Sequence, residues 1–273
     1  MSIKRFISEH HQLPQIQHLV QHRLGLTLVD LLLRGDQLIE PMRLPQLISD
    51  CQRLESGEPL AYILGEAEFY SRVFRVSADT LIPRPDSEHL VDLALALGDQ
   101  MVGERNKPAV CDLGTGSGCL AISIALERKD WEVCATDLSA SALKVARHND
   151  NQLESQVTFF LGDWFEALPS GARFDLILSN PPYIDKDDEH LEHLTHEPLS
   201  ALVADDQGLS DIELLIDQAA NFLNPRGWLL IEHGYDQGAA VRAIFDQFFN
   251  EVTTLKDYGG NERVTYGQLK ASA

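Results

Sequence analysis

The architecture of this 273-residue chain is indicated most clearly by the segment Ala109-Val110-Cys111-Asp112-Leu113-Gly114-Thr115-Gly116-Ser117-Gly118. Its first half is mostly apolar and predicts a short strand, and its second half carries glycine at every second position. The apolar residues over 118–126 predict a helix directly after it. A strand, a glycine-rich turn and a helix in this order are typical of an open α/β sheet, in which ligands bind where the strands end.

Strand-like and helix-like segments alternate through the rest of this part of the chain. Further strands are predicted over 132–136, 157–161, 174–179, 228–232, 252–256 and 263–269. Helices are predicted over 139–149, 209–223 and 235–249. Residues 174–179 are almost entirely apolar, which is typical of a parallel strand buried on both faces. The sequence therefore predicts an α/β fold, a doubly wound, seven-stranded Rossmann-like domain.

The N-terminal part has a different pattern. Apolar residues recur at helical spacing through residues 1–64, and glycine and proline interrupt them, so we expect a small bundle of short helices. Residues 65–80 resemble a β-hairpin, and 81–88 form a proline-rich turn that leads into a helix. We predict a helical domain over 1–72, a hairpin and linker over 73–88, and the α/β domain over 89–273.

The chain has a formal net charge of −20, and this charge is unevenly distributed. Residues 1–75 hold 8 Lys+Arg and 9 Asp+Glu, a balance of −1, whereas residues 76–273 hold 14 and 33, a balance of −19. Nucleic-acid binding depends on Lys and Arg side chains that neutralise phosphates. We therefore expect no direct nucleic-acid partner.

The sequence also argues against a membrane-spanning, a secreted or a metal-binding protein. No apolar run approaches the roughly 18 residues of a membrane span, and residues 1–11 lack the apolar core of a signal peptide. The four cysteines form no Cys-x-x-Cys pair, so we predict no metal site. We expect a cytoplasmic monomer that binds no membrane.

The glycine turn predicts a nucleoside ligand without a phosphate. Its spacing, G-x-G-x-G, differs from the G-x-G-x-x-G of dinucleotide-binding proteins. Asp137 follows the second strand, where an acid can accept hydrogen bonds from ribose hydroxyls. Asp163 follows the third strand and can meet an adenine amino group, and Trp164 can form a wall beside the ring. Asp112 can face an ammonium group. These features favour S-adenosyl-L-methionine, which leaves as S-adenosyl-L-homocysteine.

The most informative element is Asn180-Pro181-Pro182-Tyr183, which follows the buried strand over 174–179. Two prolines fix the backbone and remove two N–H donors. The Asn180 side-chain oxygen and the Pro181 carbonyl remain as acceptors for the two hydrogens of a planar NH2 group, and Tyr183 can stack on that group. Holding both N–H bonds can turn the nitrogen lone pair toward a sulfonium methyl group and stabilise the charge that develops on nitrogen.

Four segments together resemble the bacterial peptide chain release factor glutamine methyltransferases, the PrmC/HemK family, over nearly the whole chain. They are residues 57–65, 82–88, 112–118 and 180–183. A mild departure is Asp86-Ser87-Glu88, where many relatives have Thr at the middle position.

The resemblance implies methylation of the glutamine side-chain amide in the Gly-Gly-Gln loop of class I release factors. It implies that 114–118, Asp137, Trp164 and Asn180 contact the cofactor, that 180–183 hold the glutamine, and that the helical domain docks the release factor. Arg84 and Glu197 also match family positions, but no role follows from the sequence.

Three alternatives remain open at this point. A nucleic-acid adenine N6-methyltransferase can use the same Asn-Pro-Pro-Tyr element, but it should carry a basic recognition region, which this chain lacks. A ribosomal-protein glutamine methyltransferase would have the same core, and only the N-terminal part argues against it. A non-catalytic binding module on the same fold would not need intact cofactor and substrate elements. The acidic loop over 185–192 is compatible either with a basic partner surface or with a solvated loop.

Overall fold

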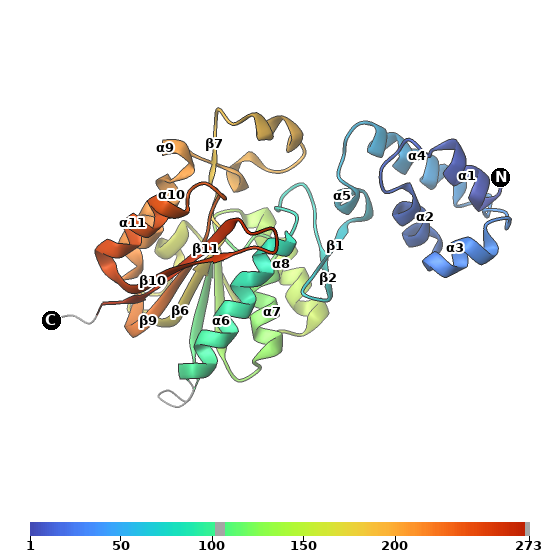
Figure 1. The fold of residues 1–273 in the computed structure, drawn as a ribbon. Coiled ribbons are helices and arrows are strands. Elements are labelled where there is room, and N and C mark those ends of the chain that lie inside the picture. The colour runs from blue at the N-terminus through green and yellow to red at the C-terminus, as the bar shows by residue number, and fades with distance from the viewer. Residues whose placement is uncertain (102–106, 271–273) are drawn as a thin grey trace. The chain divides into compact units, whose positions relative to one another are not determined.

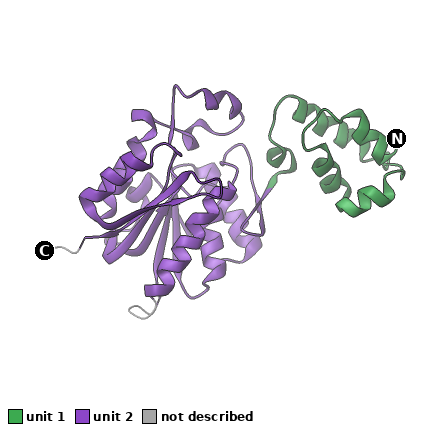
Figure 2. Ribbon diagram, viewed as in Figure 1, with its two compact units in different colours: residues 1–66 green, residues 67–273 purple. Residues whose placement is uncertain are grey.

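A computed structural model of the chain describes residues 1–101 and 107–270. It divides into two compact units, Met1–Glu66 and Ala67–Ala273 (Figure 2). This division lies after residue 66, whereas the sequence places the end of the helical domain at residue 72. The difference arises at the predicted hairpin, whose strands β1 (Glu66–Phe69) and β2 (Arg72–Arg75) belong almost wholly to the second unit.

The first unit is helical, as predicted. Its helices are α1 (Ile3–Glu9), α2 (Ile16–Leu24), α3 (Leu28–Arg34), α4 (Leu44–Glu55) and α5 (Leu60–Leu64) (Figure 1). Phe6, Leu19 and Leu47 are completely buried in its core. The carboxylate of Asp50 is also buried, and it is compensated by Arg23, whose Nε donates to it at 2.7 Å.

The second unit is built on the predicted seven-stranded sheet. In spatial order the strands are β10 (Phe249–Lys256), β11 (Glu262–Leu269), β9 (Leu223–Glu232), β6 (Phe174–Ser179), β3 (Ala109–Leu113), β4 (Glu132–Asp137) and β5 (Thr158–Leu161). The pairs from β9 to β5 are parallel, and β11 is antiparallel to both its neighbours. The doubly wound α/β prediction is confirmed.

Helices cover both faces of this sheet (Figure 1). The larger ones are α6 (Glu88–Met101), α7 (Cys119–Glu127), α8 (Ala140–Leu153), α10 (Ser210–Ala219) and α11 (Gly238–Phe248). Val110 and Leu176 belong to one core with α6 and α7, while Cys111 and Ile177 belong to the opposite core with α10 and α11. Successive strand residues therefore face opposite helical layers, which explains why these strands are apolar throughout.

The boundary between α10 and β9 differs from the prediction. The helix predicted over 209–223 ends at Ala219, and the strand begins at Leu223 rather than at 228. Pro225 and Gly227 suggest a turn, yet β9 continues through them, and its pairing with β6 shifts register between Phe174 and Leu176. An irregularity of this kind lets a strand contain a proline.

The remaining short elements lie mostly around the carboxyl ends of the parallel strands. They are η1 (Pro85–Ser87), η2 (Trp164–Ala167), β7 (Ile184–Asp185), η3 (Glu189–His193), η4 (Leu199–Ala201), β8 (Val203–Ala204) and α9 (Asp205–Gly208). Within the described residues, every helix is too short or too polar to cross a membrane.

Candidate active site

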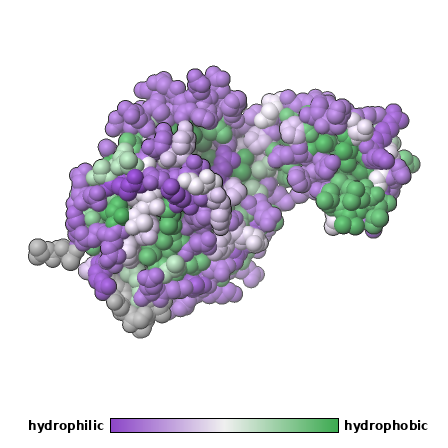
Figure 3. All heavy atoms as spheres, viewed as in Figure 1, coloured by the Kyte–Doolittle hydropathy of each residue, from purple (hydrophilic) through white to green (hydrophobic). Residues whose placement is uncertain are grey.

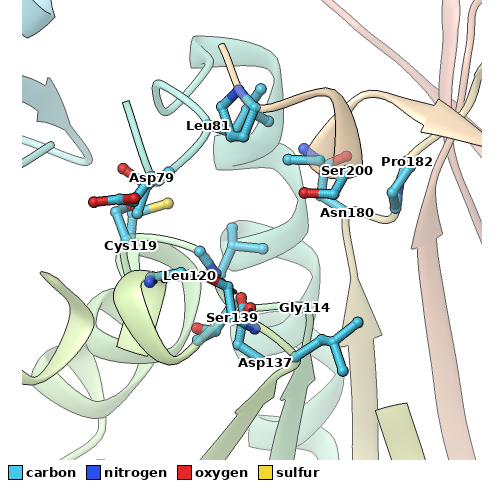
Figure 4. A pocket seen from close by; sticks show the side chains of 18 of the residues that line it. Asp79, Leu81, Gly114, Cys119, Leu120, Asp137, Ser139, Asn180, Pro182 and Ser200 are labelled. Carbon is cyan, nitrogen blue, oxygen red and sulfur yellow. Dashed lines mark hydrogen bonds between the residues drawn. The ribbon is translucent and has the colours of Figure 1, made fainter. Parts of the chain in front are cut away.

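A cavity of about 460 Å³ opens where β3, β4 and β6 end. This volume suits a nucleoside-sized ligand. The lining includes most of the residues predicted from the sequence: Gly114, Thr115, Gly116, Ser117, Asp137, Asp163, Trp164, Asn180 and Pro182. Figure 4 shows Asn180 and Pro182 together on one side of the cavity, and Gly114, Asp137 and Ser139 together at another. The cavity therefore has a glycine-turn end and an Asn180 end.

The glycine turn is held by the neighbouring strand β4. The backbone N–H groups of Gly114 and Thr115 both donate to the carbonyl of Thr136, at 2.9 and 3.0 Å. Gly114 has a φ of +73°, and a Cβ placed on it would lie 2.8 Å from the Trp164 ring. Only glycine meets both conditions, so the indole packs directly against bare backbone at the cavity wall.

Asp137 closes the glycine-turn end. Its Oδ2 accepts the backbone N–H of Gly116 and its Oδ1 accepts that of Ser139, both at 2.8 Å. Burial raises the pKa of this carboxyl above its ordinary value, and the two backbone donors limit the rise. Each carboxylate oxygen can accept more than one hydrogen bond, so Asp137 can hold the turn and still receive the hydroxyl groups of a ribose.

Asp112, which we predicted to contact the cofactor, lies behind the turn. Its side chain is completely buried, and within the described residues it is not part of the cavity lining. Oδ2 accepts the hydroxyl of Thr115 at 2.6 Å. Burial raises the pKa of Asp112 to about 7. Its position supports the turn from below. Gly118 also lies outside the lining and opens α7 with a φ of +82°.

Asp211 is an acid of the cavity lining that the sequence did not predict. Asp211, in the first turn of α10, lines the cavity together with Asp163. Burial raises the pKa of Asp211, and the nearby charges of Asp163 and Asp205 raise it further. Its position three residues after the short helix α9 gives no recognisable motif, so the sequence alone offered no signal for it.

The other end of the cavity is formed by the Asn-Pro-Pro-Tyr element after β6. The side-chain Nδ2 of Asn180 donates to Ser87 Oγ at 3.1 Å. The hydroxyl of Tyr183 donates to Glu232 Oε1 at 3.4 Å. Of the described residues, Pro181 and Tyr183 are not part of the cavity lining, and Tyr183 packs beside the core formed with α10 and α11.

The backbone of Tyr183 is fixed by two contacts from distant elements. Gln237 Nε2 donates to the Tyr183 carbonyl at 2.9 Å and to the Gln207 carbonyl at 3.0 Å. Gly208 has a φ of +78°, and a Cβ on it would lie 2.1 Å from the Tyr183 carbonyl oxygen. Asp206 and Gln207 also have positive φ values, of 55° and 56°. Such local strain is tolerated where the surrounding contacts determine the conformation.

Arg84 and Glu197, which had no role from the sequence, form an ion pair. Glu197 is buried, and its Oε2 also accepts the backbone N–H of Ile82 at 3.1 Å. This joins the proline-rich turn to the segment that begins with Pro198, and both segments line the cavity. The repeated prolines were the signal in the sequence, but the pairing of residues 113 positions apart was not visible.

Two family models match the chain. Residues 9–65 match the PrmC N-terminal domain, and residues 87–204 match the methyltransferase small domain. A crystal structure of a methyltransferase from Pyrococcus furiosus has a TM-score of 0.56 and 17% identity, and covers 81% of this chain and 98% of that one. At this identity the likeness shows the fold alone.

Curated relatives are much closer in sequence. A release factor glutamine methyltransferase from Vibrio cholerae is 46% identical over 239 residues, which are 86% of this chain and 82% of the relative. A protein of the same name from Neisseria gonorrhoeae is 44% identical over 263 residues, 94% of each chain. The resemblance indicated by the four motifs is confirmed. The chain belongs to the release factor glutamine methyltransferase family.

Proposed function

We propose that this enzyme transfers a methyl group from S-adenosyl-L-methionine to the side-chain amide nitrogen of the glutamine in the Gly-Gly-Gln loop of class I peptide chain release factors. One observation carries the proposal beyond the family relationship. The glycine turn with Asp137 and the Asn180 side chain line the same cavity of about 460 Å³. A cofactor at the first end can therefore present its methyl group to a planar nitrogen at the second.

The glycine-turn end holds the cofactor in this proposal. Asp137 accepts the ribose hydroxyls, Trp164 forms an apolar wall beside the adenine, and the bare backbone at Gly114 lets the ligand approach closely. Asp163 and Asp211 lie where they can accept hydrogen bonds from amino groups. When bound, S-adenosyl-L-methionine supplies an electrophilic methyl group on a positively charged sulfur.

The Asn180 end holds and activates the substrate nitrogen. An amide nitrogen is a poor nucleophile because its lone pair is delocalised into the carbonyl group. Asn180 Oδ1 and the Pro181 carbonyl accept its two N–H bonds, which orients the lone pair toward the methyl group and stabilises the positive charge that develops on nitrogen. Tyr183 is proposed to stack on the planar amide, although among the described residues it lies outside the cavity lining. The chemistry of the Asn-Pro-Pro-Tyr element favours these roles.

The proposal is tested with radiolabelled S-adenosyl-L-methionine and a panel of acceptors: unmodified release factor, ribosomal proteins, and DNA or RNA containing adenine. We expect label in the release factor alone. Label in a ribosomal protein would show that the substrate is a glutamine of that protein rather than of the release factor. Label in nucleic acid would establish the adenine methyltransferase alternative, and no label in any acceptor would refute the enzymatic proposal.

We further propose that the first unit docks the release factor through an apolar surface on α3. Leu28, Val29, Leu32 and Leu33 are 57%, 61%, 79% and 79% exposed. Figure 3 shows this apolar cluster over α3. Clustered exposed apolar side chains are typical of protein-binding surfaces. The match of residues 9–65 to the PrmC N-terminal domain supports the release factor as the occupant. The enzyme then works in the cytoplasm with its substrate, and we propose that it does so as a monomer.

The docking surface is tested with the double variant Leu32→Asp/Leu33→Asp. We expect KM for the release factor to rise about tenfold, since lost apolar contacts weaken association, while the Kd of S-adenosyl-L-methionine stays unchanged. Tyr235→Ser is the matched control, because Tyr235 is 60% exposed but lies in the second unit. An unchanged KM in the double variant would refute the α3 surface.

A further inference from the structure

Two buried polar side chains lie beneath the Asn-Pro-Pro-Tyr element, and neither has a role in the proposal so far. Ser87, at the end of η1, is 3% exposed, and Glu232, at the end of β9, is 1% exposed. Polar groups so deeply buried are retained only where their contacts compensate for lost hydration. The contacts of both lead to the substrate element.

Ser87 fixes the orientation of the Asn180 amide. An asparagine side chain can place either its oxygen or its nitrogen toward a ligand, and the two orientations have nearly the same shape. Asn180 Nδ2 donates to Ser87 Oγ at 3.1 Å, which commits the nitrogen to Ser87. Oδ1 then points away from Ser87 and is available as an acceptor at the cavity that Asn180 lines. An amide turned the other way would present donors to a substrate NH2 group.

Glu232 in turn determines whether the Ser87 hydroxyl acts as a donor or as an acceptor toward Asn180. An ionised carboxylate only accepts hydrogen bonds. The Ser87 hydroxyl lies beside Glu232 and lowers the pKa of its carboxyl, as a donor to the carboxylate does. We infer that the single hydrogen of the Ser87 hydroxyl is directed to Glu232, so that Ser87 Oγ accepts from Asn180 Nδ2, the hydrogen bond that the structure contains at 3.1 Å. The hydroxyl of Tyr183 also donates to Glu232, at 3.4 Å. One carboxylate therefore influences both ends of the element.

The surroundings of Glu232 leave its ionisation sensitive to pH. Burial raises the pKa to about 7, Arg263 on β11 and the hydroxyls of Ser87 and Tyr183 lower it, and Asp86 on η1 raises it. Arg263 is shared with Asp257 at 3.1 Å and with Asp86 at 3.7 Å, so it compensates Glu232 only in part. Within the described residues, Glu232 Oε2 has no hydrogen-bond partner.

We propose that Ser87 and Glu232 are positioning residues for methyl transfer: the ionised Glu232 directs the Ser87 hydroxyl, Ser87 fixes the Asn180 amide with its oxygen toward the substrate, and Glu232 also holds the Tyr183 hydroxyl. This inference rests on the proposed function, because it explains how that site is held. Ser87 lines the cavity with Asn180, whereas Glu232, among the described residues, lies outside the lining. Both act through side chains of the Asn-Pro-Pro-Tyr element.

The first test compares Ser87→Ala with Ser87→Thr. The alanine variant leaves Asn180 Nδ2 without its acceptor, so we expect kcat for release factor methylation to fall at least about tenfold, with the Kd of S-adenosyl-L-methionine within about twofold of wild type. The threonine variant keeps the hydroxyl and should recover most of kcat. Ser123→Ala is the control, because Ser123 is also a fully buried serine, on α7, and its Oγ has no hydrogen-bond partner within the described residues.

The second test is the pH profile of kcat in wild type and in Glu232→Gln. Protonated Glu232 becomes a donor and no longer directs both hydroxyls, so wild-type kcat should fall as the pH decreases through about 7. A glutamine cannot ionise, so the variant should show a lower kcat at about pH 8 and a flatter profile.

The outcomes separate this inference from the proposed function. If wild type does not methylate the release factor, the proposed function is wrong. If wild type is active and Ser87→Ala is equally fast, Ser87 does not position Asn180. A Ser87→Thr variant as slow as Ser87→Ala would show a steric role rather than a hydrogen-bonding one. A Glu232→Gln variant with the wild-type pH profile would remove Glu232 from the inference.

Discussion

The two ends of the cavity are built in different ways. The glycine-turn end is made largely of backbone and strand-end residues that are near one another in sequence or on adjacent strands, such as Gly116 and Asp137. The Asn180 end depends on side chains brought together from three separate places, η1, the end of β6 and the end of β9. The cofactor site can therefore be carried largely by adjacent strands and the turns that follow them, whereas the substrate site also requires the more distant η1 and β9.

Each end of the cavity lies next to a buried carboxyl group whose pKa is raised by burial. Glu232 is buried beneath the substrate element, and burial raises its pKa to about 7. Asp112 is equally buried beneath the glycine turn, and burial raises its pKa to about 7 although its Oδ2 accepts the Thr115 hydroxyl at 2.6 Å. We infer that both ends hold a destabilising carboxyl group whose contacts orient the side chains of the site.

The largest expected effect is that of Asn180→Ala. Removing an acceptor that acts on the developing charge should lower kcat by about 10²- to 10³-fold. The Kd of S-adenosyl-L-methionine should stay within about threefold of wild type, because the glycine turn and Asp137 remain. Single-turnover kinetics and calorimetric titration measure the two quantities. A variant with normal turnover would contradict the difference between the two ends.

Glu232→Gln should have a pH-dependent effect on stability. The pKa of Glu232 is about 7 in the fold against an ordinary value of 4.5, so the folded state binds this proton more tightly than the unfolded state. The resulting stabilisation is present below about pH 4.5 and is lost as the pH rises through 7. The free energy of unfolding of the variant, relative to wild type, should improve by up to about 3 kcal/mol between pH 5 and pH 8.

Urea unfolding of both proteins at the two pH values measures this change. A difference between wild type and Glu232→Gln that is the same at both pH values would show that Glu232 ionises as it does in the unfolded chain. In that case the Asn180 end would carry no destabilising charge.

The third prediction concerns the opposite end of the cavity. Asp137→Ala removes the acceptor proposed for the ribose hydroxyls and also the partner of Gly116. The Kd of S-adenosyl-L-methionine should rise about 10- to 100-fold, since hydrogen bonds to a charged group contribute about 1.5–3 kcal/mol. At saturating cofactor, kcat should change little. A variant with normal cofactor affinity and a low kcat would reverse the assignment of the two ends.

The smallest expected effect is that of Trp164→Phe. The phenyl ring keeps an apolar wall against Gly114 but covers less of it, so the cofactor Kd should rise about threefold. Trp131 and Trp228 are buried in the sheet-and-helix cores, whereas Trp164 lines the cavity. Cofactor binding should therefore change the tryptophan fluorescence of wild type and not that of the variant. A change that persists in the variant would place the indole away from the ligand.

The difference between the two ends of the cavity also explains which parts of the site could be predicted from the sequence. The strand before Gly114, the turn itself and the buried strand before Asn180 are local patterns, and the structure contains all three. Ser87 lies 93 positions from Asn180, Glu232 lies 49 from Tyr183, and Arg84 lies 113 from Glu197. No local pattern reveals such pairs, because they arise only when the strands align. The irregular start of β9 at Leu223 was missed because proline and glycine usually end a strand.

The predicted roles of individual site residues differ in how far the geometry supports them. Asp137, Trp164 and Asn180 line the cavity, as their proposed contacts require. Asp112 lies beneath the turn, where it can stabilise the loop without facing a ligand. Tyr183 is held by Glu232 and Gln237, and its contact with the substrate amide stays a prediction.

The proposed role of the Asn180 end is to present its acceptors to a glutamine side chain. Its most direct test is tandem mass spectrometry of unmodified release factor after incubation with the enzyme and S-adenosyl-L-methionine. We expect one added methyl group on the side-chain amide of the Gly-Gly-Gln glutamine. A methyl group on any other residue of the release factor, or none at all, would contradict it.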